Sequence, residues 1–304
     1  MADPTEFLDP KALSKFSALD LVARLVVEGF VSGLHKSPYH GFSVEFAEHR
    51  QYVPGDELRR LDWKVFARSD RFYIKQYEEE TNLRAYLLLD ASGSMRYSSD
   101  SVSKLRYGQC LSAALAYLML QQQDSVGLVT FDREVRSYLP PRSAPTHLKA
   151  IMQRLTETGA EQETKLSNIF HELAERIRRR GLIIVISDLF DDPKDLMAGL
   201  SHFRHKKHEV IVFHVLDPYE KTFPFRNWTM FRNLERGGHQ ILTEPQRVRR
   251  AYLEAFSSFC REVRRGCFQR RIDYVELDTS TPYDVSLSRY LAKRAGVLAR
   301  GRSS

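Results

Sequence analysis

The sequence predicts an α/β protein with a doubly wound, mostly parallel sheet in three layers. From residue 85 onward, short apolar runs alternate with helical segments of ten or more residues, which is the pattern of a parallel sheet covered on both faces. Right-handed crossovers between such strands put helices on both sides of the sheet. The first apolar run also ends abruptly in an acid, Asp90, as expected of a strand that meets a loop at the edge of the sheet.

The first 80 residues do not follow this alternation. Residues 11–32 have apolar side chains at helical spacing and predict an amphipathic helix. Residues 33–80 are broken by Gly and Pro, so they predict a small extension of strands and turns. The expected parts of the chain are a helix with this extension over 1–80, an α/β domain over 81–296 and a frayed tail over 297–304.

The elements of the α/β domain follow from periodicity and from residues that break helices. The predicted strands are residues 85–89, 125–131, 135–139, 182–187, 210–216, 240–243 and 274–277. The predicted helices are residues 104–122, 147–158, 166–180, 193–205, 247–271 and 286–295. Gly159 and Gly181 each follow a helical segment and are expected to end it. Pro140 and Pro141 place the strand before them at an edge of the sheet.

The most informative motif is the acid and two hydroxyls that follow the first strand. Asp90, Ser92 and Ser94 form a D-x-S-x-S pattern, and Gly93 lets the backbone curl so that the oxygens come close together. Hard oxygen donors suit Mg²⁺, with Mn²⁺ or Ca²⁺ as alternatives, and do not favour zinc. One carboxylate leaves such an ion short of negative charge, so a further anion would be attracted to it.

Other loops at the same edge of the sheet can complete this set. Asp188 follows the strand at 182–187, and Thr164 precedes the helix at 166–180. Because sites in such sheets gather at the carboxyl ends of strands, these side chains are expected near Asp90. Taken singly, Ser92, Ser94 and Thr164 could each cap a following helix instead. Their joint occurrence in this order favours a metal site.

These residues resemble the metal-ion-dependent adhesion site of the von Willebrand factor A domain, with its pattern D-x-S-x-S, then Thr, then Asp. The matching positions are Asp90, Ser92, Ser94, Thr164 and Asp188. The resemblance implies a Rossmann-like fold and an ion whose open position takes a carboxylate from a partner protein. The loop at Thr164 departs from the usual small, Gly-rich form, because Glu163 precedes it and Lys165 follows it.

The block before the α/β domain is similar to the bacterial and archaeal family called domain of unknown function 58. It includes R-Q-Y-V-P-G-D at 50–56, R-R-L-D-W-K at 59–64 and Y-I-K-Q-Y-E at 73–78. Members of this family carry such a block ahead of a von Willebrand A-like domain. The resemblance implies association with a MoxR-type AAA+ ATPase and a role as an adaptor in maturation or remodelling of other proteins.

Five residues of this block are candidates for partner binding. They are Arg50, Asp56, Arg59, Asp62 and Trp63. The spacing of Arg59 and Asp62 suits an ion pair on one helical turn. The alternative is structural, a buried ion pair and Trp contact that joins this segment to the core.

The composition limits the function classes. Hydrophobic residues at 42% and charged residues at 28% are typical of a soluble globular protein. No run approaches the roughly 18 apolar residues that span a bilayer, and the acidic start lacks the order of a signal peptide. We therefore expect a cytoplasmic protein. Three cysteines without a C-x-x-C spacing predict neither a disulfide framework nor a zinc site.

The net charge of +7 is concentrated in the predicted helix at 247–271. Its arginines are Arg247, Arg249, Arg250, Arg261, Arg264, Arg265, Arg270 and Arg271. Apolar residues between them predict an amphipathic helix with a basic outer face. This face is either simply solvated or binds an acidic surface, such as nucleic acid or a membrane.

The leading functional hypothesis is a non-enzymatic module that binds a protein partner through a divalent metal. A metal-dependent hydrolase is the alternative, but Ser92 does not lie in the G-x-S-x-G turn of hydrolases. The sequence also lacks a phosphate-binding P-loop, and we expect no small-molecule substrate. The candidate bases are His35, His40, His49, His147 and His214, and no sequence pattern places them beside Asp90.

Overall fold

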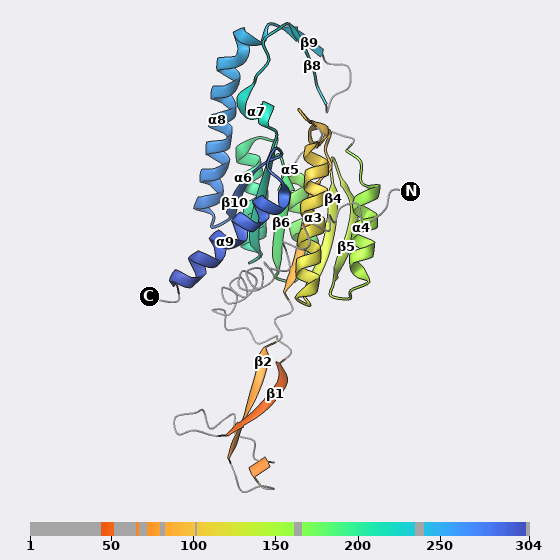
Figure 1. Cartoon of the computed structure of the whole chain (residues 1–304), viewed down its shortest axis with the longest axis vertical. Helices are drawn as coiled ribbons and strands as arrows, with labels where there is room; N and C mark the ends of the chain where they lie inside the picture. Colours follow the sequence, from red (N-terminus) through yellow and green to blue (C-terminus); the bar gives the residue numbers. More distant parts are fainter. Residues whose placement is uncertain are drawn as a thin grey trace. The chain divides into compact units, whose positions relative to one another are not determined.

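The computed structural model describes residues 44–51, 65–66, 72–79, 83–100, 102–160, 166–234 and 240–301, so the predicted helix at 11–32 lies outside it. The chain divides into two compact units, of which Val31–Asn82 is one and Leu83 onward belongs to the other. In the smaller unit, β1 (Val44–Gln51) and β2 (Tyr73–Glu79) pair antiparallel, with a bulge between Phe46 and Glu48 (Figure 1).

The larger unit is built on a six-stranded sheet in the order β10-β7-β6-β3-β4-β5. The strands are β3 (Arg84–Asp90), β4 (Ser125–Phe131), β5 (Val135–Arg142), β6 (Leu182–Ser187), β7 (Glu209–Leu216) and β10 (Asp273–Asp278). Neighbouring strands run parallel, except that the edge strand β5 is antiparallel to β4. The predicted α/β fold with a mostly parallel sheet is therefore confirmed.

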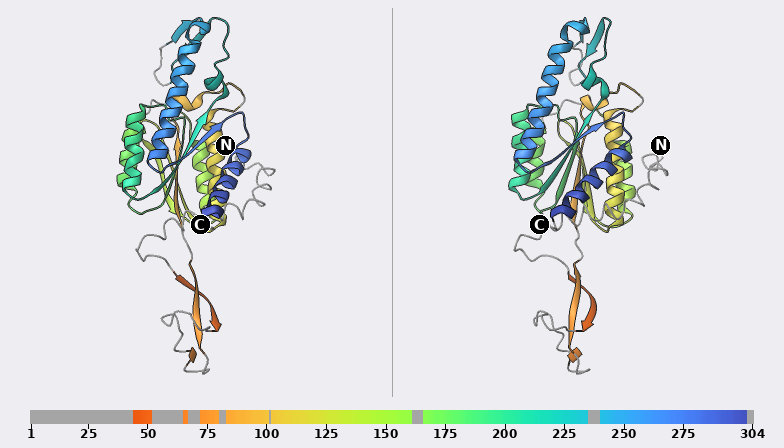
Figure 2. Two further views of the ribbon diagram at one scale, coloured as in Figure 1. Left: turned by 90° about the vertical axis from the view of Figure 1, so that its left-hand side faces the viewer. Right: turned by 60° about the vertical axis from the view of Figure 1, so that its left-hand side comes forward.

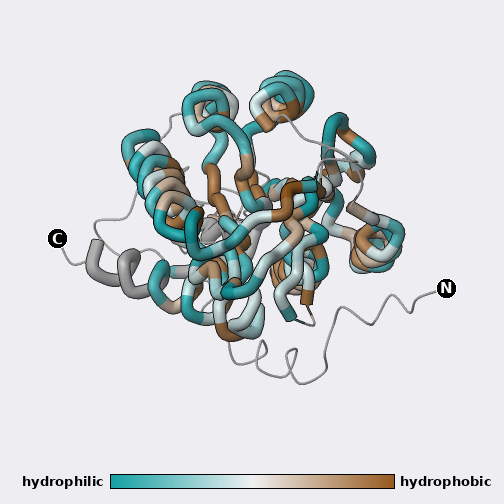
Figure 3. Tube along the Cα trace, turned by 90° about the horizontal axis from the view of Figure 1, so that it is seen from above, coloured by the Kyte–Doolittle hydropathy of each residue, from teal (hydrophilic) through white to brown (hydrophobic). Residues whose placement is uncertain are grey.

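Helices cover both faces of this sheet and make three layers (Figure 2). One face carries α3 (Lys104–Gln121), α4 (His147–Glu157) and α9 (Tyr283–Gly301). The other carries α5 (Leu166–Arg176), α6 (Pro193–His205) and the carboxyl half of α8 (Pro245–Gln269). Seen along the long axis, hydrophilic residues occupy most of the outward turns of the helices, and hydrophobic residues gather toward the sheet (Figure 3).

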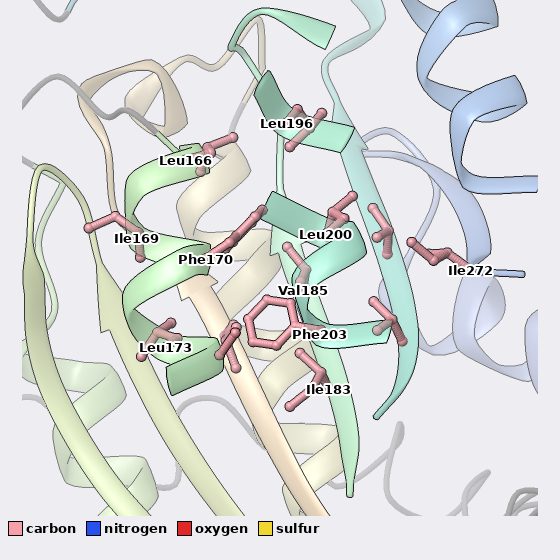
Figure 4. Close-up of a cluster of buried hydrophobic side chains, with 14 of the residues drawn as sticks. Leu166, Ile169, Phe170, Leu173, Ile183, Val185, Leu196, Leu200, Phe203 and Ile272 are labelled. Atoms are coloured by element: carbon pink, nitrogen blue, oxygen red, sulfur yellow. The ribbon is translucent and has the colours of Figure 1, made fainter. Parts of the chain in front are cut away.

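A cluster of buried apolar side chains fixes α5 and α6 against the sheet (Figure 4). Phe170 of α5 packs against Phe131 of β4 and Phe203 of α6, with ring centroids 6.0 and 5.8 Å apart. Every residue of β6 is buried, as expected for a central strand with both faces covered. On the opposite face, a side chain at Gly108 of α3 would approach Leu89 to 2.8 Å, so this glycine lets α3 lie close to β3.

An arm extends from the end of the sheet where β3 and β6 end (Figures 1 and 2). After β7 the chain forms the short helix α7 (Pro218–Thr222), then the strands β8 (Thr229–Arg232) and β9 (Gln240–Thr243), which pair antiparallel. It returns through α8, whose amino half lies beyond the sheet (Figure 1).

Several elements differ from the predicted ones. β5 continues through Pro140 and Pro141, because an edge strand needs no N–H on its outer side and its pairing with β4 is irregular there. α5 ends at Arg176, four residues before the predicted end. α9 runs beyond residue 295 to Gly301, and β8 was not predicted. Among the helices described, none is long and apolar enough to cross a membrane.

Candidate metal centre

Asp90 and Asp188 lie at the carboxyl ends of two adjacent strands. β3 pairs with β6 through Leu89 and Ile186, so Asp90 and the residue after β6 meet at one edge of the sheet. In the sheet, β4 lies on one side of β3, and β6, which comes later in the chain, lies on the other side of β3. This is the point where the strand order reverses, and open α/β sheets typically bind ligands there.

Asp90 is 1% exposed and accepts two hydrogen bonds. The Ser92 backbone N–H donates to Oδ1 at 2.8 Å, and the Ser187 hydroxyl donates to Oδ2 at 2.6 Å. Burial, together with the nearby charge of Asp188, raises the Asp90 pKa to about 7. A positive charge at this position would therefore stabilise the ionised carboxylate.

The two hydroxyls of the motif lie together beside Asp90. The Oγ atoms of Ser92 and Ser94 are 3.0 Å apart at the start of the short helix η3 (Gly93–Arg96). Ser92 occupies the N-cap position of η3, yet its side chain accepts no capping hydrogen bond from the backbone of that helix. The next helix, α3, is instead capped by Ser103. Helix capping therefore does not explain the Ser92 hydroxyl.

Asp188 is 5% exposed and is held by a buried lysine. Lys104 Nζ donates to Asp188 Oδ2 at 2.7 Å, and the Phe190 N–H lies 3.3 Å from Oδ1. Burial opposes ionisation of Asp188, but the charge and hydrogen bond of Lys104, with a further hydrogen bond from Ser94, hold its pKa below the usual range. Asp188 is therefore an anion near neutral pH, whereas Asp90, with a pKa of about 7, is only partly ionised there.

Lys104 connects this pair to the arm. Its Nζ also donates to Glu220 Oε1 at 2.7 Å, and Glu220 belongs to a capping box with Asp217 at the start of α7. Burial lowers the Lys104 pKa, but the charges of Asp188 and Glu220 outweigh it and raise the pKa above its usual value. Two carboxylates, those of Asp188 and Glu220, thus share one ammonium group, and Asp90 adds a third acid to the cluster.

His214 is held between the Asp188 backbone and Tyr274. Its Nε2 lies 2.8 Å from the Asp188 carbonyl oxygen, and its Nδ1 lies 2.6 Å from the Tyr274 hydroxyl. Because a carbonyl only accepts, Nε2 carries the proton and Nδ1 accepts from Tyr274. Burial lowers the His214 pKa to about 4, so the ring is neutral near pH 7.

The donor set suits a hard cation. Asp90, Asp188, Ser92 and Ser94 supply carboxylate and hydroxyl oxygens, the ligands that Mg²⁺ favours. Within the described ranges, no three His, Cys, Asp or Glu side chains group closely enough to bind a metal by themselves. An ion here would consequently need the serine hydroxyls and water. Lys104 would compete with such an ion for Asp188.

Four of the five residues predicted as metal ligands thus lie at one edge, and the fifth, Thr164, lies outside the described residues. Of the five residues predicted for partner binding, the structure describes Arg50 alone. Arg50 belongs to β1 in the smaller unit, and the other four lie outside the described residues. The remaining residues of that set are Asp56, Arg59, Asp62 and Trp63.

Sequence reasoning missed Ser187, Lys104 and Glu220. The position of Lys104 was the one sequence feature that could have revealed it. A cation in the first turn of a helix opposes the helix dipole, so a lysine there indicates a specific anionic partner. The spacing Asp217-x-x-Glu220 is a capping pattern visible in the sequence. Ser187 is the last residue of an apolar strand and offered no signal.

The arginines of the basic helix α8 are less available to bind a partner than the composition of the helix suggests. Arg250 pairs with Glu254 and Arg264 with Glu276, each at an N–O distance below 3 Å. Arg249 donates to the backbone carbonyl oxygens of Thr222 and Phe223. Much of its charge is therefore used within the protein, which weakens the prediction of an acidic surface as partner.

Comparison with known proteins identifies the family. The family described as "Protein of unknown function DUF58" matches residues 48–259. The chain belongs to this family. The DUF58 match includes the strands that carry Asp90 and Asp188, and α7 with Glu220.

Relatives of this DUF58 chain include Rv1480 of Mycobacterium tuberculosis, which is 25% identical over 295 residues, covering 96% of this chain and 92% of the relative. YeaD of Bacillus subtilis is 26% identical over 167 residues, 54% of this chain and 39% of the relative. Among solved structures, BatB from Bacteroides thetaiotaomicron aligns with a TM-score of 0.48 at 20% identity, over 70% of this chain and 99% of that chain.

Proposed function

We propose that this chain is a non-enzymatic interaction module that binds a divalent cation, Mg²⁺ by preference, and uses it to capture a carboxylate of a protein partner. Asp90, Ser92, Ser94 and Asp188 would hold the ion, together with Thr164. The ion would supply a positive charge that an incoming carboxylate can ligate. This proposal corresponds to a von Willebrand A-like adhesion site.

One observation carries the proposal. Two buried carboxylates, Asp90 and Asp188, lie with two adjacent hydroxyls at the point where the strand order reverses. Lys104 balances Asp188 but also pairs with Glu220, so burying Asp90 beside them is costly, and the raised pKa of Asp90 reflects that cost. A divalent ion would offset it.

The surroundings of Asp90 favour binding over turnover. Its hydrogen-bond partners are the Ser187 hydroxyl and the Ser92 backbone N–H. The nearest histidine in the described network, His214, is fixed by a carbonyl group and a tyrosine. Neither arrangement provides the base that a hydrolase would need to activate water.

The partner that we propose is a MoxR-type AAA+ ATPase or its client, with this chain as the adaptor. The support is the resemblance carried by residues 50–64 together with membership of the DUF58 family. The role would lie in maturation or remodelling of other proteins.

The test is binding of a purified MoxR-type ATPase from the same organism to the immobilised full chain. Capture in Mg²⁺ that is lost on chelation and lost in Asp90→Asn supports the proposal. Asp195→Asn is the matched control, since Asp195 is an exposed acid on α6 near the same edge. Capture that is unaffected by chelator and by Asp90→Asn would refute metal-dependent docking.

A further inference from the structure

The β8–β9 hairpin of the arm has apolar side chains on both faces. Met230 lies opposite Leu242, and Phe231 lies opposite Ile241. Because directly opposed residues of an antiparallel pair point to the same face, Met230 and Leu242 share one face and Phe231 is on the other. Trp228 immediately precedes the first residue of β8, two positions before Met230.

The inner face of the hairpin is anchored to the rest of the arm through Phe231, whereas Ile241 on the same face is 66% exposed. Phe231 stacks on Phe223 with ring centroids 5.6 Å apart and planes 12° from parallel, and it meets Phe225 edge to face at 5.3 Å. Phe223 also packs against Tyr252 of α8 at 4.6 Å. These aromatic contacts hold the hairpin as a supported platform.

The outer hairpin face, defined as Trp228, Met230 and Leu242, is exposed to solvent. Their exposed fractions are 68%, 54% and 58%. Single exposed apolar residues are ordinary, but a large tryptophan grouped with two further apolar side chains is typical of an interaction site. The inner face already fixes the hairpin, so this second apolar face is not needed for folding.

Basic residues outnumber acidic ones around this face, although Arg247 pairs with Glu244 and Arg250 with Glu254. The described part of the arm between 223 and 250 contains five arginines and a single acid, Glu244. The arginines are Arg226, Arg232, Arg247, Arg249 and Arg250. Arg232 follows Met230 by two residues and so shares its face, and both Arg226 and Arg232 are exposed. A complementary surface would therefore combine apolar and acidic side chains.

The arm is joined directly to the candidate metal centre. Glu220 of α7, which pairs with Lys104 beside Asp188, lies eight residues before Trp228. Arg249 of α8 donates to the carbonyl oxygens of Thr222 and Phe223 and so fixes the root of the arm. The hairpin lies beyond the same end of the sheet as the metal centre (Figures 1 and 2).

We infer that the outer hairpin face is the docking surface for the same protein partner, a step that rests on the function proposed above. The partner presents an amphipathic segment, whose apolar side chains cover Trp228, Met230 and Leu242 and whose carboxylates face Arg226 and Arg232. A second carboxylate-bearing residue of that partner then reaches the metal.

Two other occupants fit less well. A second copy of this chain, placed face to face, would bring the arginines of both hairpins together and repel. A membrane would contact the exposed apolar residues of the arm, Leu234 included, without supplying the carboxylate that the proposed metal centre takes, and the vesicle measurement below tests it.

The test is selection of peptides from a random display library on the full chain in the presence of chelator. The triple variant Trp228→Ser, Met230→Ser and Leu242→Ser serves for counter-selection. We expect enriched peptides rich in both acidic and apolar residues, bound at least tenfold more weakly by the triple variant and by Arg226→Glu with Arg232→Glu. Phe268→Ser, which removes an 84% exposed side chain at the far end of α8, should bind them unchanged.

Four results would overturn the inference. The first two are selected peptides without acidic enrichment and equal peptide binding by the triple variant. The other two are a concentration-dependent dimer, or co-sedimentation with phosphatidylglycerol vesicles, that the wild type shows and the triple variant does not. Adding Mg²⁺ separates the two proposals. The selected peptides could bind through the outer hairpin face in chelator while Mg²⁺ leaves the affinity for every acidic ligand unchanged. In that case the docking surface stands and the metal proposal fails.

Discussion

Asp90→Asn should stabilise the protein when no divalent metal is present. A rise in the Asp90 pKa from 3.8 to about 7 corresponds to about 4 kcal/mol against the ionised form, above pH 7. The amide keeps the size of the side chain but gives up one accepted hydrogen bond, which costs about 1–2 kcal/mol. In chelator at pH 8, the variant should therefore gain about 2–3 kcal/mol in the free energy of unfolding.

The same substitution should remove stabilisation by Mg²⁺. A ligand at 100 times its Kd stabilises the native state by about 2.7 kcal/mol. For a domain of this size, that shift raises the midpoint of thermal unfolding by roughly 5–10 °C. The wild type should show this rise and Asp90→Asn should not. The stability advantage of Asp90→Asn over the wild type should therefore shrink or reverse when Mg²⁺ replaces chelator.

The assay is urea and thermal unfolding, followed by circular dichroism, in chelator and in Mg²⁺. Asp195→Asn is the control and should respond to Mg²⁺ like the wild type. If Asp90→Asn is less stable than the wild type in chelator, Asp90 is not an electrostatically strained carboxylate. If the variant gains as much from Mg²⁺ as the wild type, Asp90 does not ligate the ion.

Three further variants test the surroundings by urea unfolding. Lys104→Met leaves Asp188 and Glu220 without their buried partner. Its free energy of unfolding should fall by about 3–5 kcal/mol in chelator, and Mg²⁺ should stabilise it more than the wild type. An unchanged response to Mg²⁺ would contradict this. Asp124 is buried, and burial raises its pKa to about 7. The unfolded chain therefore ionises first as pH rises, and the wild type should lose stability between pH 4 and 7 relative to Asp124→Asn, by up to about 4 kcal/mol; equal pH profiles would show that Asp124 is not strained. Gly181→Ala places a methyl group against the Arg84 carbonyl oxygen and should cost about 1–3 kcal/mol, whereas Gly159→Ala, which meets no neighbouring atom within 4 Å, should be nearly neutral; equal effects would contradict the close contact.

The sheet and the edge that carries the acids could be predicted because both depend on local patterns. Continuous apolar runs such as Leu182–Ser187 identify buried parallel strands, and the acids that follow them must then lie at one edge. The contacts of Lys104 could not be predicted in the same way. Its partners lie 84 and 116 residues away, and only the packing of α3 and α7 on the folded sheet brings them together.

In the arm, the strand at 240–243 and most of α8 were predicted, but β8 was not. β8 has four residues, too few for a period of two to stand out from the flanking sequence. Phe231 of β8 is fixed by Phe223, which in turn packs against Tyr252 of α8, and the sequence alone does not pair these segments. The carboxyl end of α9 and the Pro-containing end of β5 likewise depend on what each element packs against.

The most direct measurement is calorimetric titration of the full chain with Mg²⁺ at pH 8, beside Asp90→Asn and Asp195→Asn. We predict one saturable site in the wild type and in Asp195→Asn, reversed by chelator, and no binding by Asp90→Asn. Equal binding by all three proteins, or no saturable site in the wild type, would contradict a metal centre at Asp90.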